Sequence, residues 1–163
     1  MGAHVSASPN HKTGRTTPLK TRGVVAMAGT FGYELDINKM TDEDKEIVKD
    51  QIEFYKKYYD TINYGDYYRL SNPYTEEEFV AWQFVSEDQK QSLISFVQTQ
   101  SKCNAADFYI KPQGLKEEAI YQVKIDGKDL EHTPSGLALM NGGLMIPVVP
   151  GDYPACQIEI QEL

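Results

Sequence analysis

Two stretches near the N-terminus decide the fold class: HVSASPNHKTGR at residues 4–15 and RGVVAMAGTFGYELD at residues 22–36. The first begins with small and β-branched residues, which favour a buried strand over 2–7. It then changes to Pro, Asn and Gly mixed with cations, a composition typical of a loop. The second stretch ends in residues that favour another strand over 29–36. This half of the chain therefore has the alternating pattern of an α/β fold.

Two helices are expected beside these strands. Thr17 followed by Pro18 supplies an N-cap and a first-turn proline, which favours a helix over 17–28. Thr41 and the acids after it favour a longer helix over 41–62, because negative charge is stabilising at a helix N-terminus. We expect the apolar face of this longer helix to pack on neighbouring apolar surface. Its residues recur at helical spacing: Val48, Ile52, Tyr55, Tyr59 and Ile62.

After Gly65 the pattern changes to short segments rich in Val, Ile, Phe and Tyr, separated by turn residues. Asp126-Gly127 between two such segments is typical of a type I′ hairpin. This spacing predicts an antiparallel β-sandwich over 66–163. Strands are expected at 67–70, 79–86, 91–99, 107–111, 120–125, 137–140, 144–149 and 155–160.

The predicted fold class is α+β, with strand–helix–strand–helix over 1–63 and an all-β domain over 66–163. Two parallel strands with their helices cannot bury both faces of a sheet. The first half is therefore expected to need a partner that the chain lacks.

Composition limits the kinds of partner. The 24 acidic and 16 basic residues leave a net charge of −8, which argues against nucleic acid and against an anionic membrane. Cys103 and Cys156 are too few for a metal motif or a disulfide framework, and a single bridge between them is left open. The chain shows no signal peptide and no long apolar run, so a cytoplasmic location is expected.

The two N-terminal stretches, together with the 41–62 helix and the YGDYYRL after it, resemble the C-terminal part of bacterial α-galactosidases of glycoside hydrolase family thirty-six. The resemblance implies that 1–63 holds strands and helices seven and eight of a (β/α)8 catalytic barrel. It also implies that 66–163 is the β-sandwich that follows the barrel.

The resemblance implies a chemistry as well. Family members are retaining enzymes that use two aspartates, one as nucleophile and one as acid/base. Both would lie before Met1, so no catalytic residue is carried over and this chain alone is expected to be inactive. The implied parent enzyme, an α-galactosidase, hydrolyses terminal non-reducing α-D-galactose residues from oligosaccharides of the melibiose and raffinose type.

The expected partners are the missing N-terminal part of the barrel and, through the parent enzyme, α-galactosides. A homo-oligomer is left open, because unpaired strand edges within 1–36 can recruit a second copy. No cofactor, nucleic acid or membrane is expected. The alternative hypothesis is a stand-alone, non-catalytic β-sandwich that binds sugar or serves in assembly.

The candidate site residues are on the loop after the first strand. Active sites of (β/α)8 barrels form at the C-terminal ends of the strands, so this loop is expected at the active-site rim. Asn10, His11 and Arg15 are the candidate substrate-binding residues.

Four other residues suggest sites that the pattern does not favour. His4 and His11 lack a third ligand at a suitable spacing, so no metal site is expected. Glu34 and Asp36 lie on one strand, whereas a retaining pair normally comes from two. Asp36 is expected instead to cap the following turn. Trp82 lies in the middle of FVAWQFV, which favours a core position over a sugar-stacking platform.

Overall fold

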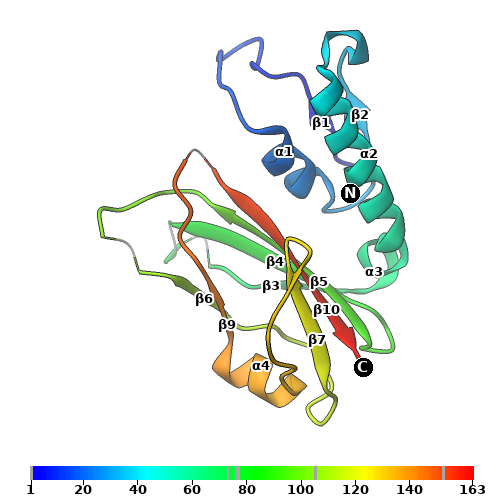
Figure 1. Ribbon diagram of the computed structural model, residues 1–163, viewed down its shortest axis with the longest axis vertical. Helices are drawn as coiled ribbons and strands as arrows, with labels where there is room; N and C mark the ends of the chain where they lie inside the picture. The colour runs from blue at the N-terminus through cyan, green and yellow to red at the C-terminus, as the bar shows by residue number, and fades with distance from the viewer. Residues whose placement is uncertain (1, 73, 76–77, 105, 152) are drawn as a thin grey trace.

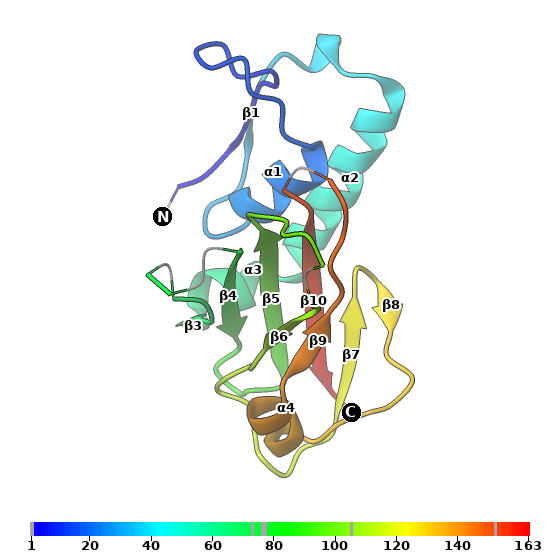
Figure 2. The same ribbon diagram turned by 90° about the vertical axis from the view of Figure 1, so that its left-hand side faces the viewer.

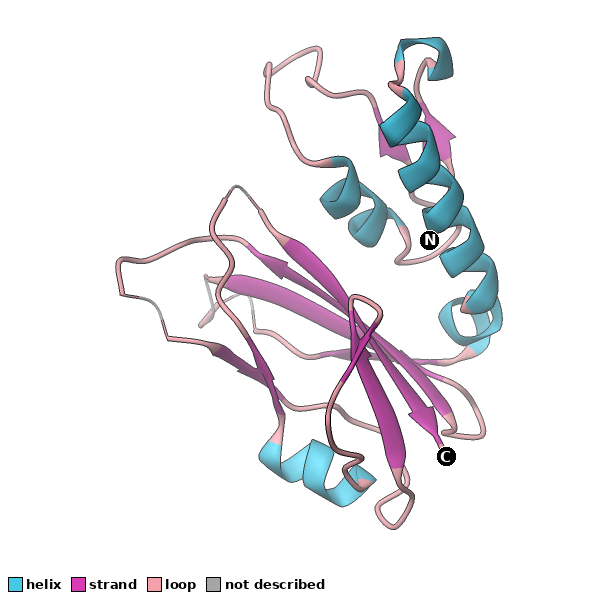
Figure 3. Ribbon diagram, in the orientation of Figure 1, coloured by secondary structure: helices cyan, strands magenta, loops and turns pink. Residues whose placement is uncertain are grey.

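The computed structural model describes residues 2–72, 74–75, 78–104, 106–151 and 153–163. Helices and two short parallel strands form one layer, which packs on a six-stranded antiparallel sheet (Figures 1 and 3). A two-stranded sheet and a short helix cover the opposite face of the large sheet. No helix among the described residues is long and apolar enough to cross a membrane.

The first layer begins with the predicted strand–helix–strand order. Strands β1 (Val5–Ser6) and β2 (Tyr33–Glu34) are parallel, with Val5 opposite Tyr33. Helix α1 (Leu19–Ala26) connects them, and a bridge between Gly2 and Thr30 extends the pairing. Both strands are shorter than the sequence predicts.

The long helix expected over 41–62 is interrupted. Thr41 caps α2 (Asp42–Lys57), and its Oγ1 accepts a hydrogen bond from Asp44 N at 3.1 Å. Tyr58, with φ −104° and ψ 10°, separates α2 from α3 (Tyr59–Tyr64).

The interruption changes which side chains face inward. Tyr58 is 1% exposed, although the helical spacing did not select it. Tyr59, which the predicted stripe includes, is 44% exposed, so the prediction is wrong there. Tyr55 and Ile62 are buried as expected, and Ile52 is half-buried. The turn at Tyr58 rotates the residues after it relative to a continuous helix.

The large sheet has the strand order β3–β4–β5–β10–β7–β8 (Figure 2). Asp126 and Gly127 form the turn between β7 and β8 with φ values of 49° and 74°. Positive φ at both central positions is what a type I′ turn requires, so the predicted hairpin is confirmed. The strands are β3 (Asp66–Arg69), β4 (Phe79–Val85), β5 (Gln91–Gln98), β7 (Tyr121–Ile125), β8 (Lys128–Asp129) and β10 (Ala155–Glu162).

The second sheet consists of β6 (Phe108–Ile110) and β9 (Leu144–Ile146), with α4 (Gly136–Gly142) beside it. The strand predicted at 137–140 is therefore wrong. Ser135 Oγ accepts a hydrogen bond from Ala138 N at 3.2 Å and begins a helix, which ends at Gly143 with φ 82°. Periodicity does not separate helix from strand in so short an apolar run.

Each face of the large sheet contributes to a core. The face toward the small sheet includes Ile94, Phe96 and Ile158. The face toward the helices includes Trp82, which is 8% exposed. The prediction that Trp82 is a core residue is confirmed, but its core lies between the sheet and the helices.

The helical layer and the large sheet are joined by a very short connection. Gly65 is the single residue between α3 and β3. A Cβ at this position would lie 2.3 Å from the carbonyl oxygen of Val85 and 2.4 Å from that of Thr61. Only glycine permits this approach of backbone to backbone.

A fragment of residues 66–163 would uncover the sheet face that carries Trp82. We expect its tryptophan fluorescence to be red-shifted from that of the whole chain and the fragment to bind the dye ANS, because apolar side chains lose their cover. Trp82 is the only tryptophan, so the signal reports this face alone. Equal emission maxima and absent dye binding would contradict the shared core.

Tyr58→Phe is expected to lower the melting temperature. Tyr58 Oη donates a hydrogen bond at 2.8 Å to Glu159 Oε2, and Glu159 is 7% exposed. Leaving that carboxylate with one partner fewer costs about 1–3 kcal/mol. Tyr109→Phe removes a hydroxyl that is exposed to solvent and is the matched control. Equal melting temperatures of the two variants would show that the buried hydrogen bond contributes nothing.

Candidate functional site

The loops that follow β1 and β2 lie at the same end of the two-stranded sheet (Figure 1). This follows from the parallel pairing of the two strands, which directs both C-terminal ends to one edge. The first loop covers residues 7–18 and contains the three candidate site residues. The second covers 35–41 and contains Asp36.

Asn10 organises the first loop from within. Its Oδ1 accepts hydrogen bonds from Lys12 N at 3.0 Å and from Thr13 N at 3.1 Å. Its backbone N donates to Arg15 O at 2.9 Å, and its carbonyl accepts from Gly14 N at 2.8 Å. The Asn10 carboxamide oxygen is thus occupied by the loop itself, an arrangement typical of an Asx turn.

Arg22 of α1 connects the two ends of the same loop. Its Nη1 donates to Ser6 O at 2.6 Å, and its Nε donates to Thr17 O at 3.0 Å. Partial burial lowers the pKa of the Arg22 guanidinium, while Asp44 and Tyr33 oppose this effect. The two ends of the loop are therefore held together by the Arg22 side chain, with a longer hydrogen bond from Thr17 N to Ser8 Oγ at 3.4 Å beside it.

Arg15 and His11 face different surroundings. The guanidinium of Arg15 lies over the ring of Tyr153, with 4.3 Å between its Cζ and the ring centroid. His11 is exposed and makes no hydrogen bond or ion pair with another described residue. Of the three candidates, His11 has the side chain with both polar atoms available to a ligand. Direct sugar contact by Asn10, His11 or Arg15 stays a prediction.

The second loop behaves as the sequence predicts. Asp36 Oδ1 accepts a hydrogen bond from Asn38 N at 3.0 Å, which confirms its capping role in the turn at Ile37–Lys39.

Glu34 Oε2 lies 3.0 Å from His4 Nε2, and both side chains are more than half exposed. The described residues contain no group of three or more His, Cys, Asp or Glu that could hold a metal ion.

An open groove of about 610 Å³ lies between β2 and α2. Phe31, Tyr33, Ile52, Tyr55 and Tyr59 contribute most of its lining. Tyr33 Oη donates to Gln51 Oε1 at 2.6 Å, and partial burial raises the pKa of Tyr33 to about 12. The groove is therefore apolar, and its one phenol at the β2 side stays protonated.

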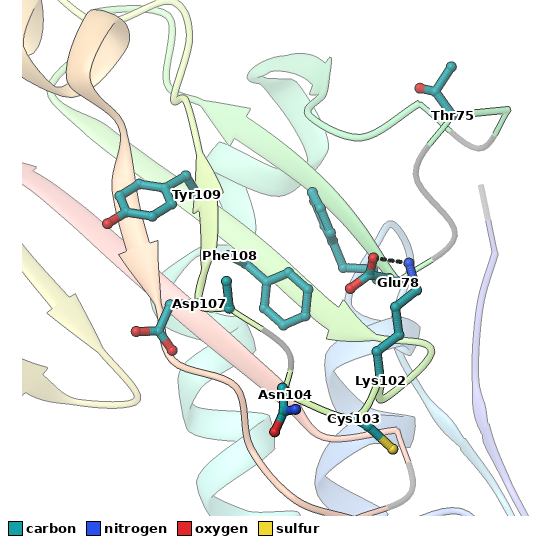
Figure 4. A pocket seen from close by; sticks show the side chains of 10 residues that line it. Thr75, Glu78, Lys102, Cys103, Asn104, Asp107, Phe108 and Tyr109 are labelled. Atoms are coloured by element: carbon teal, nitrogen blue, oxygen red, sulfur yellow. Dashed lines mark hydrogen bonds and ion pairs between the residues drawn. The ribbon is translucent and has the colours of Figure 1, made fainter.

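A second pocket lies beside the start of β4 and of β6 (Figure 4). Glu78 and Lys102 form an ion pair at its edge. The rings of Phe79 and Phe108 both pack against Phe96, with centroid distances of 5.3 Å. Phe108 is buried and Phe79 is half-buried, so these two rings do not form an exposed stacking platform. Tyr109, which also lines the pocket, is 65% exposed.

Asn10→Ala is expected to loosen the first loop. Removing Oδ1 leaves Lys12 N and Thr13 N without their acceptor, so the heteronuclear NOE values of residues 11–14 should fall. Asn10→Asp keeps an acceptor at the same position and should retain most of the order. Unchanged NOE values in Asn10→Ala would mean that the loop is held by other contacts.

Comparison with known proteins covers the whole chain. A family model described as Melibiase matches residues 1–65, and one described as Glycosyl hydrolase family 36 C-terminal domain matches residues 79–160. The chain is 47% identical to the bifunctional alpha-galactosidase/sucrose kinase AgaSK of Mediterraneibacter gnavus, over 100% of the chain and 17% of that protein. It is 40% identical to alpha-galactosidase AgaA of Geobacillus stearothermophilus, over 94% of the chain and 20% of that protein.

Solved structures show the same similarity. The galactosidase domain of AgaSK superimposes with a TM-score of 0.91, covering 100% of this chain and 22% of that chain at 47% identity. An AgaA variant in complex with stachyose gives a TM-score of 0.92 at 37% identity, with the same coverage. The chain spans about a fifth of the length of these relatives.

Proposed function

The chain belongs to glycosyl hydrolase family 36, and from this membership we propose that it is the C-terminal part of an α-galactosidase. The observation that supports this most strongly is the parallel β1–α1–β2 unit, whose two loops share one end. The Melibiase model matches the residues of this unit.

We propose that 1–63 completes a (β/α)8 barrel and that 66–163 is the C-terminal sandwich. In a closed barrel each strand has two neighbours. Among the described residues β1 and β2 pair only with each other, so each has one edge available. The groove at Phe31, Ile52 and Tyr59 offers apolar surface where the rest of the barrel would pack.

The proposed substrates are oligosaccharides with terminal α-D-galactose, of the melibiose and raffinose type. Solved relatives include AgaA variants in complex with stachyose and with raffinose. A retaining glycosidase needs two carboxylates about 5 Å apart. We propose that both come from the remainder of the enzyme, so the 163-residue chain alone does not hydrolyse galactosides.

The contribution of this chain to the chemistry is then the rim of the active site. His11 extends from the loop after β1 with both ring nitrogens free to exchange hydrogen bonds with sugar hydroxyls. Asn10 holds the backbone under His11, and Arg15 lies at the end of the loop that faces the sandwich. These three residues are the proposed substrate-side contacts or supports.

We also propose a cytoplasmic location. Cys103 is exposed, Cys156 is half-buried, and both are free thiols, as a reducing compartment permits. Burial raises the pKa of the Cys156 thiol to about 12, which keeps it protonated and unreactive.

A chimera tests the proposal. This chain replaces the matched C-terminal fifth of AgaA, and hydrolysis of p-nitrophenyl α-galactoside is measured. We expect the chimera to be active, and both the isolated 163-residue chain and AgaA lacking its matched part to be inactive. Activity of the isolated chain, or a folded chimera without activity, would refute the proposal.

Ile52→Asp in the chimera probes the groove. A carboxylate there would face the rest of the barrel without a partner, so assembly and activity should be lost. In the isolated chain the same change should cost little stability, because Ile52 is only half-buried. Leu137→Asp in α4, at an exposed position remote from the groove, is the matched control. Full activity of Ile52→Asp would exclude the groove as a barrel contact.

A further inference from the structure

The segment between β9 and β10 reaches from the sandwich to the beginning of α1 (Figures 1 and 2). Tyr153 in this segment has φ 54°, which is uncommon for a residue with a side chain. Its carbonyl accepts a hydrogen bond at 2.7 Å from Oγ1 of Thr21, which is 4% exposed. Beside it, Pro154 O accepts from Gln98 N at 2.9 Å. The backbone of Tyr153 is thus held between α1 and β5.

The ring of Tyr153 lies under the guanidinium of Arg15. A planar cation on an aromatic face is a directional contact, because the attraction depends on the cation staying over the ring. Arg15 is exposed, whereas Tyr153 is half-buried and packs against the core between the helices and the large sheet. Among the described residues the contact of Arg15 with Tyr153 is the side-chain contact that joins the 7–18 loop to the segment between β9 and β10.

The effect of this contact on the loop follows from the loop's own hydrogen bonds. Arg15 O accepts from Asn10 N, and Asn10 Oδ1 holds Lys12 and Thr13. A displacement of Arg15 is therefore transmitted to Asn10 and to His11 beside it. Arg22 holds the two ends of the loop, because its hydrogen bonds go to Ser6 and Thr17. Arg15 is the loop residue that both contacts Tyr153 and is hydrogen-bonded to Asn10.

A second contact holds the helix and not the loop. Lys20 Nζ lies 2.5 Å from Asp126 Oδ2, and Asp126 Oδ1 accepts from Gln157 N at 3.1 Å. This connects α1 to the β7–β8 turn and to β10. The sandwich therefore contacts α1 through Asp126 and through the Tyr153 carbonyl, and it contacts the loop through the Tyr153 ring. Changes to the Tyr153 side chain leave the two contacts with α1 in place.

We propose that Tyr153 is a positioning residue for the active-site rim: through Arg15 it sets the place of the loop that carries His11. The sandwich would then take part in substrate binding without touching the substrate. This inference rests on the proposed function for the identity of the site, but the ordering of the loop is measurable without any activity.

The first test uses the 163-residue chain and NMR. Tyr153→Ala should lower the heteronuclear NOE of residues 10–15, and Tyr153→Phe, which keeps the ring face, should match the unaltered chain. Arg15→Ala removes the exposed partner of the contact and leaves the core residues unchanged. It should reproduce the effect of Tyr153→Ala. Tyr58→Phe weakens the helix–sheet contact elsewhere and should leave these NOE values unchanged. Unchanged values in both Tyr153→Ala and Arg15→Ala would overturn the proposal.

The second test uses the AgaA chimera. Tyr153→Ala should lower kcat/KM by about two- to five-fold, since a surface cation–π contact shifts the population of the ordered loop by a factor of this order. Tyr153→Phe should match the unaltered chimera, because the ring face that contacts Arg15 is retained. Arg15→Ala combined with Tyr153→Ala should lower kcat/KM no further than either change alone, because the pair acts as one unit.

Additive losses in that cycle, or a Tyr153→Phe loss equal to that of Tyr153→Ala, would overturn the positioning role. An unaltered chimera without activity would refute the proposed function instead. The NMR result would then still decide whether Tyr153 orders the loop.

Discussion

The packing of the helices on the outer face of the large sheet is the interaction on which the rest of the structure depends. Trp82, Phe84 and Leu93 on the sheet share this core with Met27, which follows α1, and with Tyr58, which lies between α2 and α3. Burial of each such side chain contributes about 1.5–3 kcal/mol. Without this contact the large sheet would expose an apolar face. The helices that pack against β1 and β2 would also lose the sheet that supports them.

A buried carboxylate gives this apolar contact its specificity. Glu159 on β10 accepts a hydrogen bond from Tyr58 Oη and lies 2.5 Å from Lys57 Nζ. Burial is the main reason that the pKa of Tyr58 is raised, with Glu159 adding to the effect, so the phenol stays a donor. Apolar side chains can shift against one another at little cost, whereas a buried carboxylate that shifts loses its two partners. The helices are therefore held at one register on the sheet.

Stability and positioning come from different contacts in this chain. The exposed contact of Arg15 with Tyr153 has a strength of about 0.5–1 kcal/mol, small beside the apolar contact. It nevertheless acts on the loop after β1, which is not part of the apolar core between the helices and the sheet. The large apolar contact holds the sandwich in place against the helices. Tyr153 therefore has a fixed position from which its weak, directional contact can act on Arg15. The proposed role of Tyr153 rests on this division: the contact that would position the loop is separate from the contacts that hold the fold together.

The sequence by itself determined the elements whose signals are local, such as the Thr41 cap and the Asp126-Gly127 turn, because such caps and turns depend on neighbouring residues. The tertiary structure alone decided the break at Tyr58 and which core contains Trp82, since both depend on residues distant in the chain. It also decided how the candidate loop is used. Asn10 and Arg15 were identified from loop composition and resemblance, but Tyr153, more than a hundred residues away, was not. A lone tyrosine in a Pro- and Gly-rich segment carries no local signal, and its role arises only where folding brings it under Arg15.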